Sequence, residues 1–230
     1  REHAIAWKLA QSPKVDKIYV APGNGGTALE NKCENINITD IDKLVEFAKN
    51  NDIHLTVVGP EDPLTKGITD KFKAEGLRCF GPDFEGAKLE GSKSFSKFFM
   101  KKYGVKTAEY EVFTNPEEAL SYLYDCQYPI VIKADGLAAG KGVVICESKK
   151  DAMKAVQNLM IDDAFNGAGQ KIVVEEFLEG VEASILSICD GKRIIPFISA
   201  KDHKQIYDGG KGPNTGGMGV LAPNPYVTSE

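Results

Sequence analysis

The first ninety residues alternate short runs of β-branched side chains with amphipathic stretches, and this alternation limits the fold more than any other feature. Residues 17–21, 55–59 and 78–81 have the composition of strands, whereas residues 41–50 and 68–75 have the apolar periodicity of helices. Strands that alternate with helices in this way predict a parallel α/β sheet. A chain of 230 residues is long enough for one or two such domains.

A second pattern begins near Thr107, where strands follow one another with fewer helices between them. The strand-like segments are residues 109–114, 129–134, 143–147 and 171–175, and the helical ones are residues 116–124 and 151–160. Asn115 stands where an N-cap is expected, directly before a proline. Antiparallel pairing across a glycine-rich connection predicts a small α+β module in this region.

Two further strands are predicted at residues 184–189 and 193–199, joined by a tight turn at Asp190 and Gly191. The glycine-rich residues 208–219 are predicted to form a long loop. Three aromatic residues earlier in the chain share one helical face and are expected in the core: Phe95, Phe98 and Phe99.

Composition excludes several classes of function. The net charge of -5, from 28 basic and 33 acidic residues, gives no basic stripe, so we expect no nucleic-acid partner. The sequence has neither an apolar run long enough to span a membrane nor the layout of a signal peptide, and we expect a cytoplasmic protein.

The five cysteines lie far apart and are interpreted as reduced packing residues. Because there is no initiating Met, we expect the chain to be a portion of a longer one.

Residues 135–142 place three glycines and Lys141 between two predicted strands. Backbone N–H groups in such a loop can approach an anion closely, which makes it a candidate phosphate loop, although a plain turn is the simpler interpretation. Lys133 lies in the middle of the apolar strand before the loop, where an ammonium is costly without an anionic partner. A lysine on the solvated face of the strand is the alternative.

The strand near residue 175 ends in two carboxylates and two apolar side chains, and a further carboxylate follows. These residues are Glu175, Glu176, Phe177, Leu178 and Glu182. Carboxylates and free backbone groups at a strand end can read an adenine edge and ribose hydroxyls, but such a segment alone is more often a solvated loop. The order of lysine strand, glycine-rich loop, helix and acidic segment is more specific than any of its parts.

Two segments, residues 131–143 and 215–219, have the form of family signatures, and residues 1–4, 21–24, 58–61, 89–93, 202–204 and 212–215 support them. On these segments the whole chain resembles the glycinamide ribonucleotide synthetases, which are ATP-grasp enzymes. The chain departs from the family pattern at four positions: Asp62 replaces a common Ala, Lys201 replaces Gln, Gln205 replaces Arg and Gly210 replaces Asp.

The resemblance implies an α/β fold: a parallel, Rossmann-like pre-ATP-grasp domain, then an ATP-grasp α+β lid and the start of the ATP-grasp core. The implied boundaries are residues 1–90 for the N-terminal substrate-binding domain, whose first strand is missing, 110–177 for the lid, and 91–109 with 178–230 for the incomplete core. The chain is then the N-terminal portion of the enzyme. Fusion to further purine-pathway domains remains open.

The implied reaction joins glycine to 5-phosphoribosylamine through glycyl phosphate, giving glycinamide ribonucleotide, ADP and phosphate in purine biosynthesis. ATP and Mg²⁺ or Mn²⁺ are the implied cofactors, with the metal ligands expected beyond Glu230. By itself, this portion is expected to be inactive. The alternatives are another ATP-grasp carboxylate-amine ligase and a nucleotide-binding module without catalysis.

The resemblance also assigns roles to individual residues. The implied nucleotide-binding residues are Lys93, Lys133, Gly140, Lys141, Gly142, Glu175, Glu176, Phe177, Leu178 and Glu182. The implied catalytic residues are Lys133, Lys204, Asn214 and Thr215. The implied substrate-binding residues are Arg1, Asn24, Gly25, Glu61, Gly216 and Gly217. His203 is interpreted as a structural histidine in preference to a general base.

Overall fold

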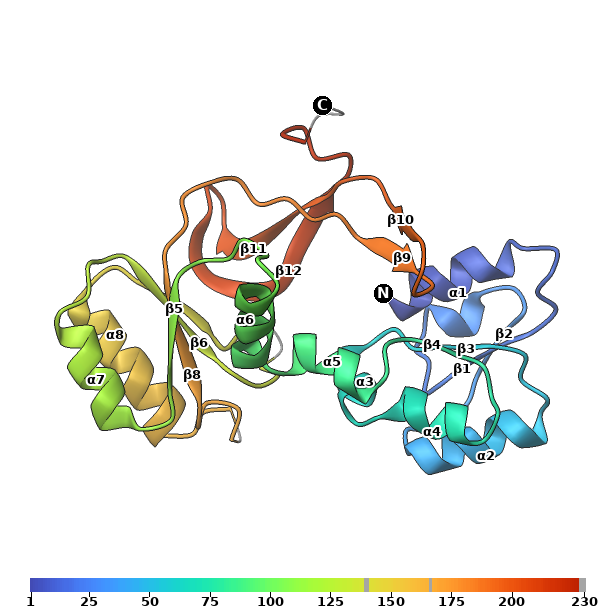
Figure 1. Ribbon diagram of the computed structural model, residues 1–230. Coiled ribbons are helices and arrows are strands. Elements are labelled where there is room, and N and C mark those ends of the chain that lie inside the picture. Colours follow the sequence, from blue (N-terminus) through green and yellow to red (C-terminus); the bar gives the residue numbers. More distant parts are fainter. Residues whose placement is uncertain (139–140, 166, 228–230) are drawn as a thin grey trace. The chain divides into compact units, whose positions relative to one another are not determined.

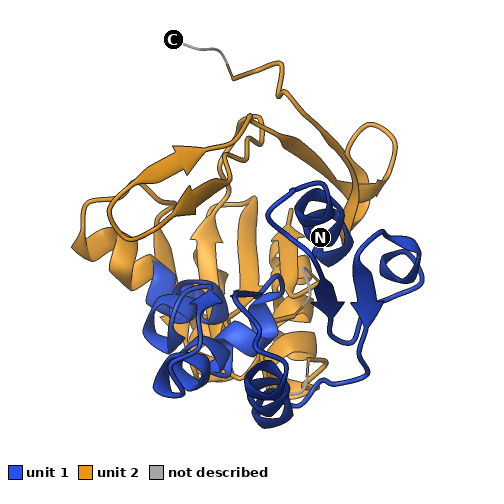
Figure 2. Cartoon of the chain, turned by 90° about the vertical axis from the view of Figure 1, so that its right-hand side faces the viewer, with its two compact units in different colours: residues 1–96 blue, residues 97–230 orange. Residues whose placement is uncertain are grey.

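The computed structural model describes residues 1–138, 141–165 and 167–227. The chain divides into two compact units, residues 1–96 and residues 97–230, which Figure 2 shows in separate colours. In the described ranges, no helix combines the length and the apolar composition needed to cross a membrane. The domain boundaries expected from the sequence stay predictions.

Unit 1 consists of short parallel strand pairs connected through helices (Figure 1). β1 (Ile18–Val20) pairs in parallel with β2 (Cys33–Asn35), and β3 (Thr56–Val57) pairs in parallel with β4 (Cys79–Phe80). The helical elements are α1 (Glu2–Ala10), the 3₁₀ turn η1 (Thr27–Leu29), α2 (Ile41–Asn50), α3 (Glu61–Thr65), α4 (Ile68–Ala74) and α5 (Phe84–Gly91). The predicted parallel α/β class of this region is confirmed.

The core of unit 1 forms where α2 packs against α4. Val45 of α2 and Ile68 and Phe72 of α4 are buried together in this cluster. The carboxylate of Asp40 caps α2 by accepting a hydrogen bond from the backbone N–H of Lys43 at 3.0 Å. Apolar periodicity predicted both α2 and α4, because each helix buries its apolar face in this cluster.

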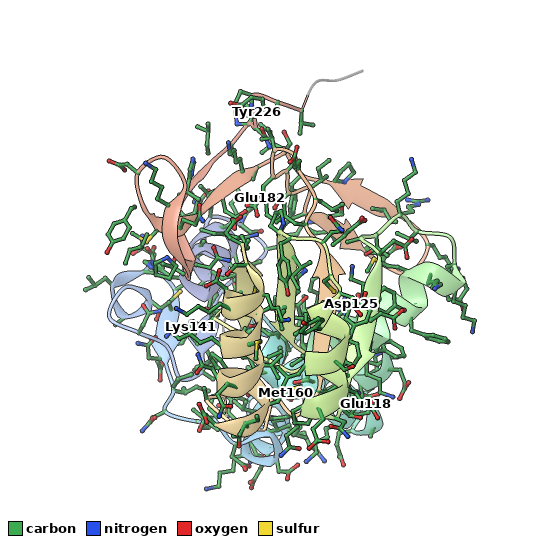
Figure 3. All side chains as sticks on the ribbon, turned by 90° about the vertical axis from the view of Figure 1, so that its left-hand side faces the viewer. Glu118, Asp125, Lys141, Met160, Glu182 and Tyr226 are labelled. Atoms are coloured by element: carbon green, nitrogen blue, oxygen red, sulfur yellow. The ribbon has the colours of Figure 1, made fainter. Side chains whose placement is uncertain are left out.

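Unit 2 contains a four-stranded antiparallel sheet with the order β5-β8-β6-β7. Its strands are β5 (Tyr110–Phe113), β6 (Ile130–Ala134), β7 (Val143–Cys146) and β8 (Ile172–Glu176). Two helices cover the sheet: α7 (Pro116–Tyr124) and α8 (Lys149–Val156). Helix α8 continues as a π-helical turn over Gln157–Ile161. Figure 3 shows α7 and α8 side by side over one face of the sheet. The predicted α+β module is confirmed.

The two helices and the sheet enclose the larger of the two core clusters found among the described residues. Leu123, Ile132, Leu159 and Ile172 are all buried in it. Asn115 begins α7 as predicted, because its side chain accepts a hydrogen bond from the backbone N–H of Glu117 at 2.8 Å. This core fixes the sheet, whose opposite face carries Lys133 and Glu175.

Two β-hairpins complete unit 2. β9 (Ser187–Cys189) pairs with β10 (Ile194–Pro196), and β11 (Lys201–Tyr207) pairs with β12 (Lys211–Leu221), both antiparallel. The prediction of a long loop at residues 208–219 is therefore wrong, since most of these residues belong to β12. Glycine is depleted in strands, so the sequence pattern favours a loop, but backbone pairing with β11 overrides this preference, with two irregularities in the register.

Helix α6 (Lys93–Lys102) contains a second correction. Phe98 is 59% exposed, so the three phenylalanines do not all lie in the core. The buried residue of this helix is Lys97, whose ammonium donates hydrogen bonds to Thr107 and Ala108 and forms an ion pair with Glu175. Periodicity of apolar residues failed here because it cannot detect a buried cation that is held by hydrogen bonds.

The five cysteines are free thiols, as the sequence indicates. Cys146 of β7 is fully buried in the unit 2 core. Burial, followed by the negative charges of Asp151 and Glu147, raises the pKa of the Cys146 thiol from 9.0 to about 11. Thiols react as thiolates, so this raised pKa makes Cys146 inert at neutral pH.

We predict that Cys146 resists alkylation at pH 8 in the folded protein. A rise in pKa from 9.0 to about 11 lowers the thiolate fraction by roughly a hundredfold, and burial blocks access as well. The measurement is the rate of iodoacetamide labelling at each cysteine, read by mass spectrometry of peptides. The exposed Cys189 is the internal control. Equal labelling rates at Cys146 and Cys189 before denaturation would contradict the assignment.

Candidate functional site

One face of the four-stranded sheet is covered by α7 and α8, and the other carries the candidate site. Along β6, Ile130, Ile132 and Ala134 are buried toward the helices, so Val131 and Lys133 lie on the opposite face. Cross-strand partners share a face, and Lys133 pairs with Val143 and Val173 while Val131 pairs with Glu175. We call this set, Val131, Lys133, Val143, Val173 and Glu175, the lysine face.

An ion-pair network holds the lysine face together. The Lys133 ammonium lies 2.9 Å from Oε2 of Glu175, and the Lys97 ammonium lies 3.1 Å from the same oxygen. The side chains of Lys97 and Glu175 are only 7% and 6% exposed, whereas that of Lys133 is 27% exposed. Lys97 also donates to Oγ1 of Thr107 at 2.7 Å and to the carbonyl of Ala108 at 3.1 Å.

This network explains how a lysine can occupy the middle of an apolar strand. Lys133 has the anionic partner that its position requires, and that partner, Glu175, was assigned to the same site from the sequence. Lys97 was missed by the sequence analysis. The one available signal was its position one helical turn after Lys93, on the same face of α6.

The glycine-rich loop closes tightly on the ends of β6 and β8. The backbone N–H of Ala134 donates to the carbonyl of Gly142 at 2.8 Å, and that of Asp135 donates to the carbonyl of Lys171 at 2.9 Å. A Cβ at Gly142 would lie 2.7 Å from Cβ of Ala138, so this glycine is needed for the close approach. Lys141 is exposed and available to solvent anions, while Gly140 lies outside the described residues.

The acidic segment continues from the end of β8. The backbone N–H of Glu109 donates to Oε1 of Glu176 at 3.1 Å, and the backbone N–H of Glu176 donates to the carbonyl of Glu109 at 3.0 Å. Phe177 is partly buried and Leu178 is exposed. An open depression lies beside this segment, lined by Glu175, Glu176 and Phe177 and by residues from the end of α7 to the start of β6.

A second cluster joins the β11-β12 hairpin to Glu182. The Lys204 ammonium lies 3.2 Å from Oε1 of Glu182 and 3.8 Å from Oδ2 of Asp202. Thr215 donates from Oγ1 to the carbonyl of Lys204 at 2.8 Å and accepts from the backbone N–H of Gly217 at 3.1 Å. The structure thus brings together Lys204 and Thr215, both predicted to be catalytic, and Glu182, predicted to bind the nucleotide.

The other predicted residues of this hairpin also have clear positions. Asn214 is paired with Gln205 across the two strands. Gly216 borders open space, since a Cβ there would meet no atom within 4 Å. Asn224, which the sequence analysis missed, is buried and donates to the carbonyls of Glu182 and Ala200 at 3.1 and 3.2 Å. It fixes the backbone that carries Glu182.

Unit 1 brings two of its predicted substrate residues together. Arg1 precedes α1 and donates from Nη1 to the carbonyl of Gly59 at 2.9 Å and to Oε2 of Glu61 at 3.3 Å. The side-chain oxygen of Asn24 is used locally, since it accepts from the backbone N–H groups of Gly26 and Thr27 at 2.8 and 3.0 Å.

Gly25 and Lys93 are the other two predicted residues. Gly25 lies in open space, where a Cβ would meet no atom within 4 Å. Lys93 is the first residue of α6, one turn before Lys97. The ligand-binding roles of all these residues stay predictions, because proximity by itself does not show a ligand.

Two family models together match the full length of the chain. The phosphoribosylglycinamide synthetase N domain matches residues 1–90, and the phosphoribosylglycinamide synthetase ATP-grasp (A) domain matches residues 91–230. The phosphoribosylamine-glycine ligase of Clostridium acetobutylicum is 67% identical over 230 residues, which is 100% of this chain and 55% of that protein. The chain therefore spans about half the length of the curated relatives it matches.

Solved structures agree with these matches. A crystal structure of phosphoribosylamine-glycine ligase from Thermotoga maritima has a TM-score of 0.77 at 35% identity, covering 95% of this chain and 52% of that one. The N5-carboxyaminoimidazole ribonucleotide synthetase of Thermus thermophilus has a TM-score of 0.70 at 16% identity, covering 99% and 57%, which is a likeness of fold alone. The predicted α/β fold with an ATP-grasp region is thereby confirmed. The chain belongs to the phosphoribosylglycinamide synthetase family, and its two matched regions are the N domain and the ATP-grasp (A) domain of that family.

Proposed function

We propose that this chain supplies the nucleotide site and part of the amine site of an enzyme that uses ATP to join glycine to 5-phosphoribosylamine. The observation that carries the proposal is the Lys133–Glu175 pair on the lysine face, in a chain whose relatives are named phosphoribosylamine-glycine ligase. A partly exposed ammonium beside a glycine-rich loop suits a polyphosphate. The apolar side chains around it suit a planar base.

The nucleotide would lie along the lysine face. Lys133 and Lys93 would bind the phosphate oxygens, and the loop that ends at Lys141 and Gly142 would close over them. The bond from Ala134 to Gly142 keeps the end of that loop beside Lys133. The segment from Glu175 to Leu178 would read the adenine, and Glu182 the ribose.

The reaction would proceed in two steps that need positioning and charge stabilisation without a side-chain nucleophile. A carboxylate oxygen of glycine attacks the γ-phosphorus of ATP, the bond from that phosphorus to the bridging oxygen breaks, and ADP leaves. The amine nitrogen of phosphoribosylamine then attacks the carbonyl carbon of glycyl phosphate. The carbon–oxygen bond to phosphate breaks, inorganic phosphate leaves, and the nitrogen loses a proton. Lys133 and Lys204 would stabilise the negative charge on the transferred phosphoryl oxygens.

The amine substrate would bind to the residues that the family resemblance assigns to it. Arg1 would contact its phosphate at the start of α1, a helix that has no side-chain cap. Glu61 would accept hydrogen bonds from the sugar, and its pairing with Arg1 holds both side chains in one place. The other residues predicted for this substrate are Asn24, Gly25, Gly216 and Gly217.

Magnesium is the cation expected with ATP. The described residues include no group of three or more His, Cys, Asp or Glu side chains that could hold a metal ion. Bound with ATP, Mg²⁺ would supply charge neutralisation at the phosphates.

Replacement of Lys133 by Ala tests the proposal in the full-length protein that contains this chain. We predict that ADP release requires glycine and phosphoribosylamine together, and that Lys133→Ala lowers its rate on the order of a hundredfold or more, because a charged phosphate ligand is lost. The measurement is a coupled ADP assay with each substrate supplied alone or together. The matched control is Lys154→Ala, an exposed lysine on α8 at the covered face of the sheet.

Three outcomes would contradict the proposal in different ways. Turnover that is indifferent to phosphoribosylamine would indicate another ATP-grasp ligase. ATP binding without glycine-dependent ADP formation would indicate a binding module. Full activity of Lys133→Ala would remove the lysine face from the nucleotide site.

Replacement of Gly142 by Ala tests the glycine-rich loop. The added Cβ would lie 2.7 Å from Cβ of Ala138 and 3.0 Å from Cβ of Ala134, so the loop must shift. Overpacking of this kind costs about 1 to 3 kcal/mol, and we expect the KM for ATP to rise roughly fivefold or more. Gly219→Ala is the control, because open space surrounds that position. An unchanged KM at Gly142→Ala would show that the loop is not part of the ATP site.

A further inference from the structure

Two ammonium groups share a single buried carboxylate oxygen, and they are held very differently. The Nζ atoms of Lys133 and Lys97 lie 2.9 and 3.1 Å from Oε2 of Glu175. One ammonium is enough to neutralise one carboxylate, so charge balance does not explain why Glu175 is paired with two lysines.

Lys97 is held by three polar partners. Its ammonium donates hydrogen bonds to Oγ1 of Thr107 at 2.7 Å and to the carbonyl of Ala108 at 3.1 Å, and it forms an ion pair with Oε2 of Glu175 at 3.1 Å. The ring of Tyr110 lies 5.5 Å from this ammonium. Departure of Lys97 from this position would leave several buried polar groups without a partner, which is unfavourable.

Lys133 is held less completely. Its side chain is about four times as exposed as that of Lys97, 27% against 7%, and it projects from the middle of β6 on the lysine face. Its bond to Glu175 is the one that a phosphate ligand would have to displace or share. If Lys133 were the sole partner of Glu175, its turn toward a phosphate would leave a buried carboxylate unpaired, which is strongly unfavourable.

We propose that Lys97 is a positioning residue for nucleotide binding: it is the permanent counter-charge of Glu175, which frees Lys133 to exchange the carboxylate for an ATP phosphate. The inference rests on the proposed role of Lys133 and adds a residue that does not itself touch the nucleotide. Lys97 acts through Glu175. Without Lys97, the carboxylate retains Lys133 and competes with the phosphates for it.

The test is a double-mutant cycle measured by isothermal titration calorimetry with ATP and Mg²⁺ on the full-length protein. Lys97→Met removes the charge and keeps an unbranched side chain. We expect it to weaken ATP binding roughly tenfold or more in the presence of Glu175, because breaking the remaining buried pair then opposes binding. In the Glu175→Gln background, the same Lys97→Met change should alter ATP affinity less than about twofold, since no carboxylate competes for Lys133.

Adenosine binding distinguishes the proposed role of Lys97 from a purely structural one, because a structural defect would weaken adenosine and ATP binding alike. It lacks phosphates, so Lys133 has no reason to leave Glu175 when adenosine binds. We expect Lys97→Met to change adenosine affinity less than about threefold, well below the change for ATP. Equal losses for adenosine and ATP, or equal losses of ATP affinity in the Glu and Gln backgrounds, would overturn the inference and leave Lys97 a packing residue.

A second variant guards against misfolding of Lys97→Met. Lys97→Gln keeps a hydrogen-bonding end near Thr107 and Ala108 and also removes the charge, and it is expected to give the same cycle. Thermal unfolding of each variant is measured first, and only variants that unfold cooperatively are used in the binding comparison. ATP binding by the unaltered protein separates the two proposals: its absence would overturn the nucleotide site and this inference with it, whereas ATP binding that is insensitive to both Lys97 variants would overturn the inference alone.

Discussion

The carboxylate of Glu175 lies almost fully buried between the ammonium groups of Lys97 and Lys133, and the candidate nucleotide site depends on this arrangement. Removal of one partner from a buried ion pair costs about 3 to 5 kcal/mol, because the other charge is left without compensation. The three side chains come from α6, β6 and β8, which are separate in the sequence. Their network therefore links the helix that precedes the sheet to the two central strands.

The core on the other face of the sheet makes this network possible. Ile132 of β6 and Ile172 of β8 are buried against α7 and α8, which fixes the register of the two strands. Because side chains alternate along a strand, burial of Ile132 places Lys133 on the opposite face, and burial of Val174 does the same for Glu175. A slip of one residue would exchange the faces and break both the core and the ion pair.

The sequence predicted much of this structure, for reasons that are local. Apolar periodicity identified α2 and α7, and the resemblance of the whole chain to the glycinamide ribonucleotide synthetases assigned Lys133 and Glu175 to the nucleotide; the structure pairs these two residues. The failures concern long-range contacts. Lys97 is buried because of partners 10, 11 and 78 residues away, and β12 is a strand because β11 pairs with its glycines. Neither partner set can be read from local composition.

The most direct test of the account is a crystal structure of the full-length protein with Mg²⁺ and a nonhydrolysable ATP analogue. The account predicts that Nζ of Lys133 lies within roughly 3 Å of a phosphate oxygen while Lys97 remains paired with Glu175. It would be contradicted by an analogue bound away from the lysine face, or by one bound there without any contact between its phosphates and Lys133.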